Sequence, residues 1–324
     1  MYGGDSSEWE ISVLSGQNVA LHINRDRYEV YEILMRGSSW RVVKAADGGV
    51  PDEQDAQVNK DHFSFCWNGK KVLFDVVFVM IHGTPGEDGI LQSYFESLHI
   101  PFTSSSSVVS ALAFDKYACK CALRNAGINM AKELVIRKNE KIDEQEIVDA
   151  LGLPLFIKPN SGGSSFGASK VKRIEEVMPA IVRAFSEGTT VLAEEFLEGR
   201  ELTNGILKTA SQTVKLPVTE IVSKNEFFDY QAKYQGASRE ITPAPIPDSL
   251  KEKVQHLTSK IYEHLGCKGF VRMDYIVRGA DVVFLEVNTI PGMSSLSIIP
   301  QQAAAAGISM STFLEWLIED AFRL

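Results

Sequence analysis

The sequence predicts an α/β protein whose carboxyl-terminal half is α+β. One observation is an apolar run at residues 76–81, which has the composition of a buried strand and leads into a glycine-rich loop. A second is a pair of strands at residues 270–277 and 282–288, rich in Val, Ile, Phe and Tyr. Amphipathic helical patterns at residues 249–265 and 312–322 flank this pair. We expect a partly parallel sheet in the amino-terminal part of the chain.

The composition is that of a globular protein. The 324 residues, 44% hydrophobic and 23% charged, allow two or three domains. The net charge of -9, with no block rich in Lys or Arg, argues against nucleic acid or an anionic membrane as partner. The apolar run at residues 72–81 is interrupted by Asp75 and far shorter than the roughly 20 residues of a membrane span. No export signal is evident at the start, so we expect a cytoplasmic protein. Four cysteines without metal-ligand spacing indicate reduced, structural thiols.

Local signals predict several further elements. Ser7 and Glu10 have the spacing of a capping box that would open a helix. Asn68-Gly69 predicts a hairpin between residues 63–67 and 71–74. Residues 82–89, HGTPGEDG, follow the buried run, at the strand end where open α/β sheets bind ligands, although a plain turn is the alternative. One helix is predicted over residues 107–125.

A phosphate-binding loop is predicted after a short strand at residues 155–159. That strand carries Lys158 near its end, and residues 160–167 continue as NSGGSSFG. Backbone N–H groups and hydroxyls of such a loop can surround phosphates, while the lysine supplies a positive charge. The chain contains neither GxxxxGK[ST] nor GxGxxG, which argues against a P-loop or a dinucleotide-binding fold. The alternative is a flexible Gly/Ser connection.

The carboxyl-terminal strand pair carries the main chemical signal. If Gly279-Ala280-Asp281 form a three-residue loop, Arg278 pairs with Val282 and the same register places Asp274 opposite Glu286. Side chains alternate between faces, so one face would hold the polar residues Arg272, Asp274, Glu286 and Asn288, and the other would hold Val271, Met273, Leu285 and Val287.

Directly opposed carboxylates repel each other, and a divalent cation between them would remove that cost. Oxygen ligands from Asp274, Glu286 and Asn288 suit Mg²⁺. A solvated sheet face with ordinary charges is the alternative, but the Asn-Thr-Ile-Pro-Gly turn that follows argues for a site.

These motifs resemble one known family. RMD at residues 272–274 and LEVNTIPGMSSLS at residues 285–297 resemble the metal and phosphate strand pair of ATP-grasp ligases. Within that superfamily the chain is most similar to the D-alanine-D-alanine ligase family, because HGTPGEDG, the FDK at residues 114–116 and the FFDYQAKY at residues 227–234 follow in the family's order. The resemblance implies an ATP-grasp fold with domains at 1–103, 104–197 and 198–324, and a homodimer.

The resemblance also implies an activity and its cofactors. One D-alanine carboxylate attacks the γ-phosphate of ATP to give an acyl phosphate, and the amine of a second D-alanine displaces phosphate. ATP and two Mg²⁺ ions are implied, with Mn²⁺ as a substitute. The implied metal ligands are again Asp274, Glu286 and Asn288, and the implied ATP-binding residues are Lys116, Lys158, Ser165, Glu194, Phe196, Leu197, Glu201, Phe227 and Lys233.

Substrate roles follow by motif position. Glu8 would hold the first D-alanine's ammonium, with His82 near the same subsite, and Ser297 would contact the second substrate's carboxylate. Arg272 and the backbone N–H of Gly292 would stabilise the oxyanion. The remaining implied residues are Ser164, Tyr234 and Ile298, the last standing where the family usually has Leu. A Tyr at position 234 goes with dipeptide synthesis in this family, whereas Phe goes with hydroxy-acid acceptance.

Other functions stay open from sequence alone. A ligase that uses D-lactate or D-serine as second substrate is one alternative, and a non-catalytic ATP-binding protein is another, although Arg272 beside the metal set argues for chemistry. A structural α/β domain or an oxidoreductase without nucleotide is a further alternative. Only Met1 and Tyr2 precede Gly3-Gly4, where the family has a central strand. We therefore expect that strand to be missing here and the natural protein to begin a few residues upstream.

Overall fold

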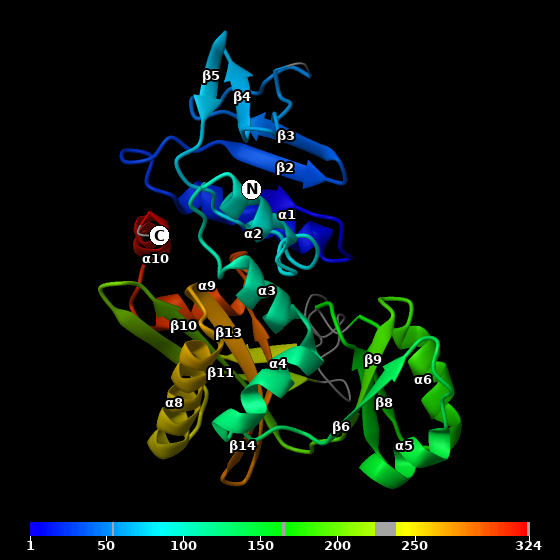
Figure 1. Ribbon diagram of the computed structural model, residues 1–324. Helices are drawn as coiled ribbons and strands as arrows, with labels where there is room; N and C mark the ends of the chain where they lie inside the picture. The colour runs from blue at the N-terminus through cyan, green and yellow to red at the C-terminus, as the bar shows by residue number, and fades with distance from the viewer. Residues whose placement is uncertain (54, 164–165, 224–237, 323–324) are drawn as a thin grey trace.

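The computed structural model describes residues 1–53, 55–163, 166–223 and 238–322, which form three packed bodies (Figure 1). The amino-terminal body, in blue and cyan, lies at the top of the view. A long antiparallel sheet with its helices forms the carboxyl-terminal body, and a smaller sheet in green lies beside it. The predicted α/β class with a partly parallel amino-terminal sheet is confirmed. Within the described ranges, no helix has the length and apolar character needed to cross a membrane.

The amino-terminal sheet is built around a very short first strand. β1 (Tyr2–Gly3) pairs in parallel with β2 (Glu32–Arg36), which pairs antiparallel with β3 (Ser39–Lys44). On its other side, Tyr2 forms a parallel bridge to Met80, and the Met80 N–H donates to Met1 O at 2.9 Å. The expectation that the first strand is absent is therefore wrong, because these residues occupy the central place. Within residues 76–81, Val77, Val79, Met80 and Ile81 are buried, and the run pairs through isolated bridges rather than a full ladder.

Glycine is required where β1 ends. A Cβ on Gly3 would lie 2.2 Å from the Met35 carbonyl oxygen, and its φ of +107° disfavours any other residue. The chain then enters α1 (Trp9–His22), which starts one residue later than a capping box at Ser7 requires. That prediction is wrong, because Glu8 occupies the N-cap position and its N–H donates to the Ser6 hydroxyl at 3.2 Å.

The remaining amino-terminal elements follow the sequence signals. The predicted hairpin is confirmed as β4 (Ser64–Trp67) and β5 (Lys70–Leu73). Asn68 and Gly69 between them have φ of 51° and 72°, as a two-residue turn of this type demands. α2 (Ile90–Ser97) begins directly after the HGTPGEDG loop and buries Leu91 and Phe95 in the amino-terminal core.

The carboxyl-terminal body is a five-stranded antiparallel sheet with helices packed against it. The strand order is β12 (Ser238–Ile241), β11 (Thr213–Ser223), β10 (Arg200–Lys208), β13 (Gly269–Arg278) and β14 (Asp281–Asn288). The accompanying helices are α8 (Asp248–Leu265), α9 (Ile298–Ala305) and α10 (Met310–Ala321). Residues of α9 and α10, among them Ile299 and Phe313, also share one core with the amino-terminal body.

The helix predicted over residues 107–125 is interrupted. α3 (Ser107–Phe114) and α4 (Lys116–Leu123) meet at Asp115, whose backbone is extended and whose carboxylate accepts from the Ala118 N–H at 2.8 Å. An N-capping aspartate therefore divides the predicted helix. The short 3-10 helix Arg124–Ala126 follows. Ala113 and Leu123 belong to the core of the carboxyl-terminal body.

The smaller sheet has a core of its own. Its strand order is β6 (Glu133–Arg137), β9 (Thr190–Glu195), β7 (Leu155–Pro159) and β8 (Ser169–Val171). α5 (Glu144–Leu151), the 3-10 helix Ile174–Glu176 and α6 (Val177–Ala184) pack with it. This core begins at β6, so α3 and α4 pack outside it. The domain boundaries at 104 and 198 remain predictions.

The strand pair β13–β14 shows how the functional face is formed. The predicted pairings Asp274 with Glu286 and Arg272 with Asn288 are confirmed. The predicted loop is wrong, since Arg278 pairs with Asp281 and the turn has two residues. A β-bulge at Leu285 shifts the pairing by one residue, so the predicted register holds at Asp274 and Glu286. Leu285 consequently lies toward the same cavity as Glu286, not on the opposite face as predicted.

Candidate active site

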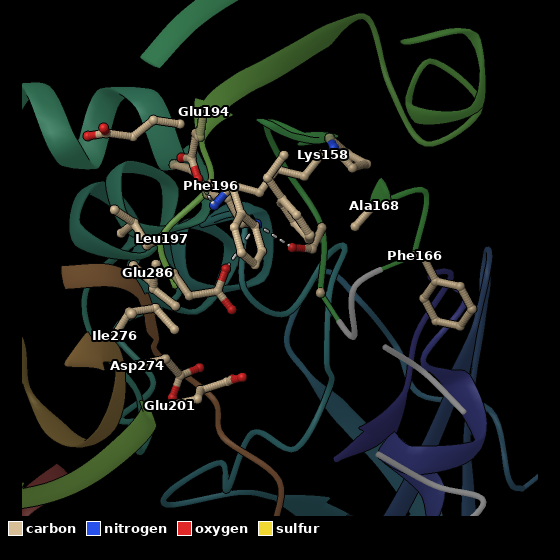
Figure 2. A pocket seen from close by; sticks show the side chains of 17 residues that line it. Lys158, Phe166, Ala168, Glu194, Phe196, Leu197, Glu201, Asp274, Ile276 and Glu286 are labelled. Carbon is tan, nitrogen blue, oxygen red and sulfur yellow. Dashed lines mark hydrogen bonds and ion pairs between the residues drawn. The ribbon is translucent and has the colours of Figure 1, made fainter. Parts of the chain in front are cut away.

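A cavity separates the small sheet from the β13–β14 hairpin (Figure 2). Its volume of about 160 Å³ is comparable to the ~150 Å³ that holds a benzene ring in an engineered protein cavity. In Figure 2 the carboxyl groups of Glu201, Asp274 and Glu286 gather in the lower part of the view, below the Phe196 ring. The predicted residues that line this cavity are Lys116, Lys158, Glu194, Phe196, Leu197, Glu201, Asp274 and Glu286. The structure thus brings eight separated sequence positions together.

One part of the cavity is apolar. Phe156 of β7, Ala168 before β8, and Ile276 and Leu285 of the hairpin join Phe196 and Leu197 in lining it. The Lys170 ammonium lies 3.7 Å from the centre of the Phe196 ring, a cation–π contact that holds this ring. Flat apolar walls with nearby carboxylates suit an aromatic base attached to a sugar.

A buried chain of alternating charges supports Lys158. The Lys158 ammonium lies 2.8 Å from Glu194 Oε2, and Glu194 also pairs with Lys120, a fully buried lysine on α4. Lys120 lies 2.9 Å from Glu133 Oε2, which in turn meets Arg124 at the surface. Glu194 is therefore primarily an electrostatic anchor for two lysines.

The pKa values of this chain follow from burial and charge. Burial raises the pKa of Glu194, but the ammonium groups of Lys158 and Lys120 outweigh burial and lower it to about 2. Burial lowers the pKa of Lys120, but Glu194 and Glu133 outweigh it and raise that pKa above its usual value. For Lys158 burial dominates, and its pKa is lowered although Glu194 opposes the change. The charged form of Lys158 is thus incompletely compensated, and an additional anion such as phosphate would favour it.

The opposed carboxylates each have a cationic neighbour. Arg272 donates to both oxygens of Asp274, at 2.9 and 2.8 Å, and Lys116 lies 3.4 Å from Glu286 Oε2. Thr203 and Asn288 also donate to Asp274, at 2.5 and 3.2 Å. Two carboxylates and an amide form a set of hard oxygen donors that fits Mg²⁺. Across the described ranges, no three His, Cys, Asp or Glu side chains group into a metal site.

Glu8 lies against the glycine-rich loop. A Cβ on Gly163 would stand 2.3 Å from Glu8 Oε2, so the loop backbone lies directly against this carboxylate. Lys116 donates to the Gly162 carbonyl at 2.7 Å. A second cavity, of about 260 Å³, is lined by Glu8 and Gly83, and it shares Gly162, Gly163 and Phe166 with the first. The predicted first-substrate residue therefore lies next to the predicted nucleotide cavity.

His82 is buried with both ring nitrogens engaged. Nδ1 lies 2.8 Å from the Ile290 carbonyl and Nε2 lies 3.1 Å from the Ser15 hydroxyl. The carbonyl can only accept, so Nδ1 carries the proton and Nε2 accepts from Ser15. Burial lowers the pKa of His82, which favours this neutral form. Its role as a substrate contact stays a prediction.

Glu87 shares that buried region and was not assigned a role from sequence. Its carboxylate accepts from the Gly83 N–H at 2.8 Å and from the Ile290 N–H at 3.3 Å. Burial, with a smaller contribution from Glu8, raises the pKa of Glu87 to about 8. Glu87 therefore links the HGTPGEDG loop to the turn after β14.

The turn after β14 holds the predicted second-substrate residues. A Cβ on Gly292 would meet Ser297 Oγ at 2.8 Å, and Ser297 lies 2.8 Å from the Ser294 hydroxyl. Ile298 is buried in the first turn of α9. Five predicted residues lie outside the described ranges, namely Ser164, Ser165, Phe227, Lys233 and Tyr234.

Sequence reasoning missed Lys120, Thr203 and Lys170. A weak signal existed for Lys120, which follows Lys116 by four residues and so shares its helix face. Its burial depends on Glu133 and Glu194, which come from other strands and carry no local signature. Thr203 reaches Asp274 only because β10 pairs with β13.

Family comparison covers nearly the whole chain. Residues 1–105 match the model described as D-ala D-ala ligase N-terminus, and residues 122–319 match the D-ala D-ala ligase C-terminus. A D-alanine--D-alanine ligase of Phocaeicola vulgatus is 47% identical over 321 residues, covering 99% of this chain and 97% of the relative.

Solved structures show the same fold. The VanG D-Ala:D-Ser ligase of Enterococcus faecalis superposes with a TM-score of 0.86 at 32% identity, covering 99% of this chain and 97% of that one. The D-alanine--D-alanine ligase of Bacillus anthracis complexed with ATP superposes with a TM-score of 0.78 at 29% identity, covering 99% and 96%. The predicted ATP-grasp fold is therefore confirmed.

The buried pair predicts a specific acid response. The folded pKa of Glu194, about 2, lies below the 4.5 of an ordinary glutamate, so its stabilisation is complete above pH 4.5 and declines as pH falls toward 2. Glu194→Gln removes this titration. Urea unfolding between pH 3 and pH 6 should show a shallower loss of stability in the variant. Equal pH slopes in the two proteins would contradict the assignment.

Removing the buried lysine should destabilise the fold. Lys120→Met leaves Glu133 and Glu194 with one cation fewer in a buried setting, which should cost about 3 kcal/mol of unfolding free energy. Arg124→Met is the matched control, because Arg124 meets the same Glu133 while half exposed and should cost less than about 1 kcal/mol. Denaturant titration measures both. Similar losses of unfolding free energy in the two variants would show that the buried ion pairs of Lys120 stabilise the fold no more than the surface pair of Arg124.

Proposed function

The chain belongs to the D-alanine-D-alanine ligase family, and from that premise we propose how its own residues perform the reaction. The enzyme joins two D-alanine molecules into D-alanyl-D-alanine with consumption of ATP, for peptidoglycan precursor synthesis. The observation that carries the residue assignment is the convergence of Lys116, Lys158, Asp274 and Glu286 on one cavity with an apolar side.

ATP would bind with its base among the apolar residues and its phosphates toward the lysines. Phe196 and Leu197 would contact adenine, and Glu201 would meet the ribose. Lys116 and Lys158, with Lys233 and Ser165 from outside the described ranges, would meet the phosphates. The charge chain through Glu194 supports Lys158 in this task, because a fixed cation stabilises phosphoryl transfer without reorganisation.

Asp274, Glu286 and Asn288 would hold Mg²⁺, for which Mn²⁺ is a substitute. When bound, the metal neutralises phosphate charge and orients the γ-phosphate for attack. Arg272, which pairs with Asp274, would act as an oxyanion donor together with the Gly292 N–H.

The substrates would occupy the second cavity and the turn after β14. Glu8 would hold the ammonium of the first D-alanine beside His82, and Ser297 with Ile298 would face the second. The first carboxylate attacks phosphorus and ADP leaves. The second amine then attacks the acyl carbon, phosphate departs with the electron pair of the C–O bond, and a proton is released to solvent.

Location and assembly complete the proposal. The use of ATP by the family supports a cytoplasmic enzyme. The family resemblance supports a homodimer, which sedimentation analysis at micromolar concentration can test.

Incubation with ATP, Mg²⁺ and D-alanine, followed by detection of ADP and dipeptide, tests the function itself. ADP formation without dipeptide would contradict it.

Glu286→Gln removes one ligand charge with almost no change in size. Because the metal stabilises several kcal/mol of developing charge, ADP production should fall at least about a hundredfold while folding is retained. Asp281→Asn, an exposed position on the same hairpin, is the control and should leave turnover unchanged. Near-normal activity of Glu286→Gln at moderate Mg²⁺ would refute the metal assignment.

Tyr234 is proposed to select the second substrate. Its phenol would hydrogen-bond Ser164 and close the site over Glu8, which excludes water from the acyl phosphate. Tyr234→Phe should weaken dipeptide synthesis and let D-lactate compete, most at lower pH where free amine is scarce. Competition assays with D-alanine and D-lactate across pH measure the product ratio. An unchanged ratio in the variant would remove Tyr234 from this role.

A further inference from the structure

Four side chains of the amino-terminal body hold the Ile290–Met293 turn. The Asn18 amide donates to Met293 O at 2.7 Å, and the Met293 N–H donates to Ser15 Oγ at 3.1 Å. His82 Nδ1 donates to Ile290 O at 2.8 Å, and the Ile290 N–H donates to Glu87 at 3.3 Å. We name these four residues, Ser15, Asn18, His82 and Glu87, the turn clamp.

The clamp fixes the backbone on both sides of Gly292. The carbonyl of Ile290 belongs to the peptide plane before Pro291, and the N–H of Met293 belongs to the plane after Gly292. The plane that carries the Gly292 N–H lies between these two anchored planes. The ring of Pro291 restricts its own φ, so the remaining freedom of that plane resides in the ψ of Pro291 and the torsions of Gly292.

The Ser15 hydroxyl connects the two halves of the clamp. His82 Nδ1 donates to a carbonyl, so Nε2 accepts and the Ser15 O–H must donate to it at 3.1 Å. The Ser15 oxygen then remains available to accept from Met293, as observed. Ser15 and Asn18 lie one turn apart on α1, with Ser15 fully buried and Asn18 half-buried. A single helix therefore sets both the N–H and the carbonyl of Met293.

We propose that Ser15 and Asn18 are positioning residues that aim the Gly292 N–H at the oxyanion of the second reaction step. The inference rests on the oxyanion role proposed for Gly292. A donor that is held in place before the charge develops stabilises a transition state far better than one that must reorient. Glycine allows close approach but is the most flexible residue, so the rigidity must come from its neighbours.

The two reaction steps depend differently on this donor. In the first step a carboxylate oxygen attacks phosphorus, and no tetrahedral carbon forms. In the second step the amine nitrogen bonds to the acyl carbon, negative charge develops on the carbonyl oxygen, and phosphate leaves with the electron pair of the C–O bond. Loss of the clamp should therefore slow dipeptide formation and spare acyl phosphate formation. A purely structural role would affect both.

The test uses Ser15→Ala, Asn18→Ala and Asn18→Asp in the full-length protein. Asn18→Asp keeps the shape of the side chain but removes the N–H donor, so it should behave like Asn18→Ala. Gln17→Ala, an exposed change on the same helix, is the control. Positional isotope exchange in ATP, at a D-alanine concentration that fills only the first subsite, reports acyl phosphate formation. Steady-state dipeptide synthesis reports the second step.

We expect kcat for dipeptide to fall between about tenfold and a hundredfold in the three clamp variants, with isotope exchange within about twofold of wild type. A parallel fall in both rates, or unchanged dipeptide synthesis, would overturn the inference. If Ser15→Ala unfolds, Asn18→Ala and Asn18→Asp still test the inference, because Asn18 is only half-buried and its replacement should leave the protein folded. If wild type shows neither exchange nor dipeptide, the proposed function fails instead, which separates the two conclusions.

Discussion

The direct opposition of Asp274 and Glu286 across β13 and β14 is the constraint on which the site depends. Two carboxylates in that arrangement repel, and the fold brings a cation to each of them. Arg272 reaches Asp274 from its own strand, and Lys116 reaches Glu286 from the start of α4. Because Lys116 also donates to Gly162, the same compensation brings the glycine-rich loop to the hairpin. A divalent cation between the carboxylates would take over the neutralisation that Arg272 and Lys116 provide.

Beside the small sheet, buried charges are likewise compensated by ion pairs. Glu194 is held between Lys120 and Lys158, and both lysines are removed from most solvent contact. Buried charges that lack partners are expensive, so each member of the chain fixes the position of the next. Lys158 lies at the cavity end, and among the described residues its ion-pair partner Glu194 is shared with Lys120. A phosphate bound as we propose would therefore meet a lysine that Glu194 already orients.

Local sequence patterns predicted those parts of the site that depend on periodicity. The pairing of Asp274 with Glu286 followed from side-chain alternation, and it held although the predicted turn was wrong, because the bulge at Leu285 compensates the shorter turn. The predicted face of Leu285 was wrong because the bulge falls at this residue. The break at Asp115 was missed because a helical pattern does not show that an aspartate will cap rather than continue. Burial of Lys120 was beyond reach, since its partners come from β6 and β9, which only the folded sheet brings to α4.

The three bodies contribute different chemistry to one reaction path. The small sheet and the hairpin enclose the cavity suited to nucleotide and metal, whereas the amino-terminal body contributes Glu8 and the side chains that hold the turn after β14. Those side chains cross from one body to another, as does the core that joins Ile299 and Phe313 to the amino-terminal sheet. The turn therefore takes part of its geometry from α1, none of whose residues lines the cavity between the small sheet and the hairpin. Under the role that we propose for Gly292, a change in α1 would alter acyl transfer while leaving Lys116 and Lys158 in place.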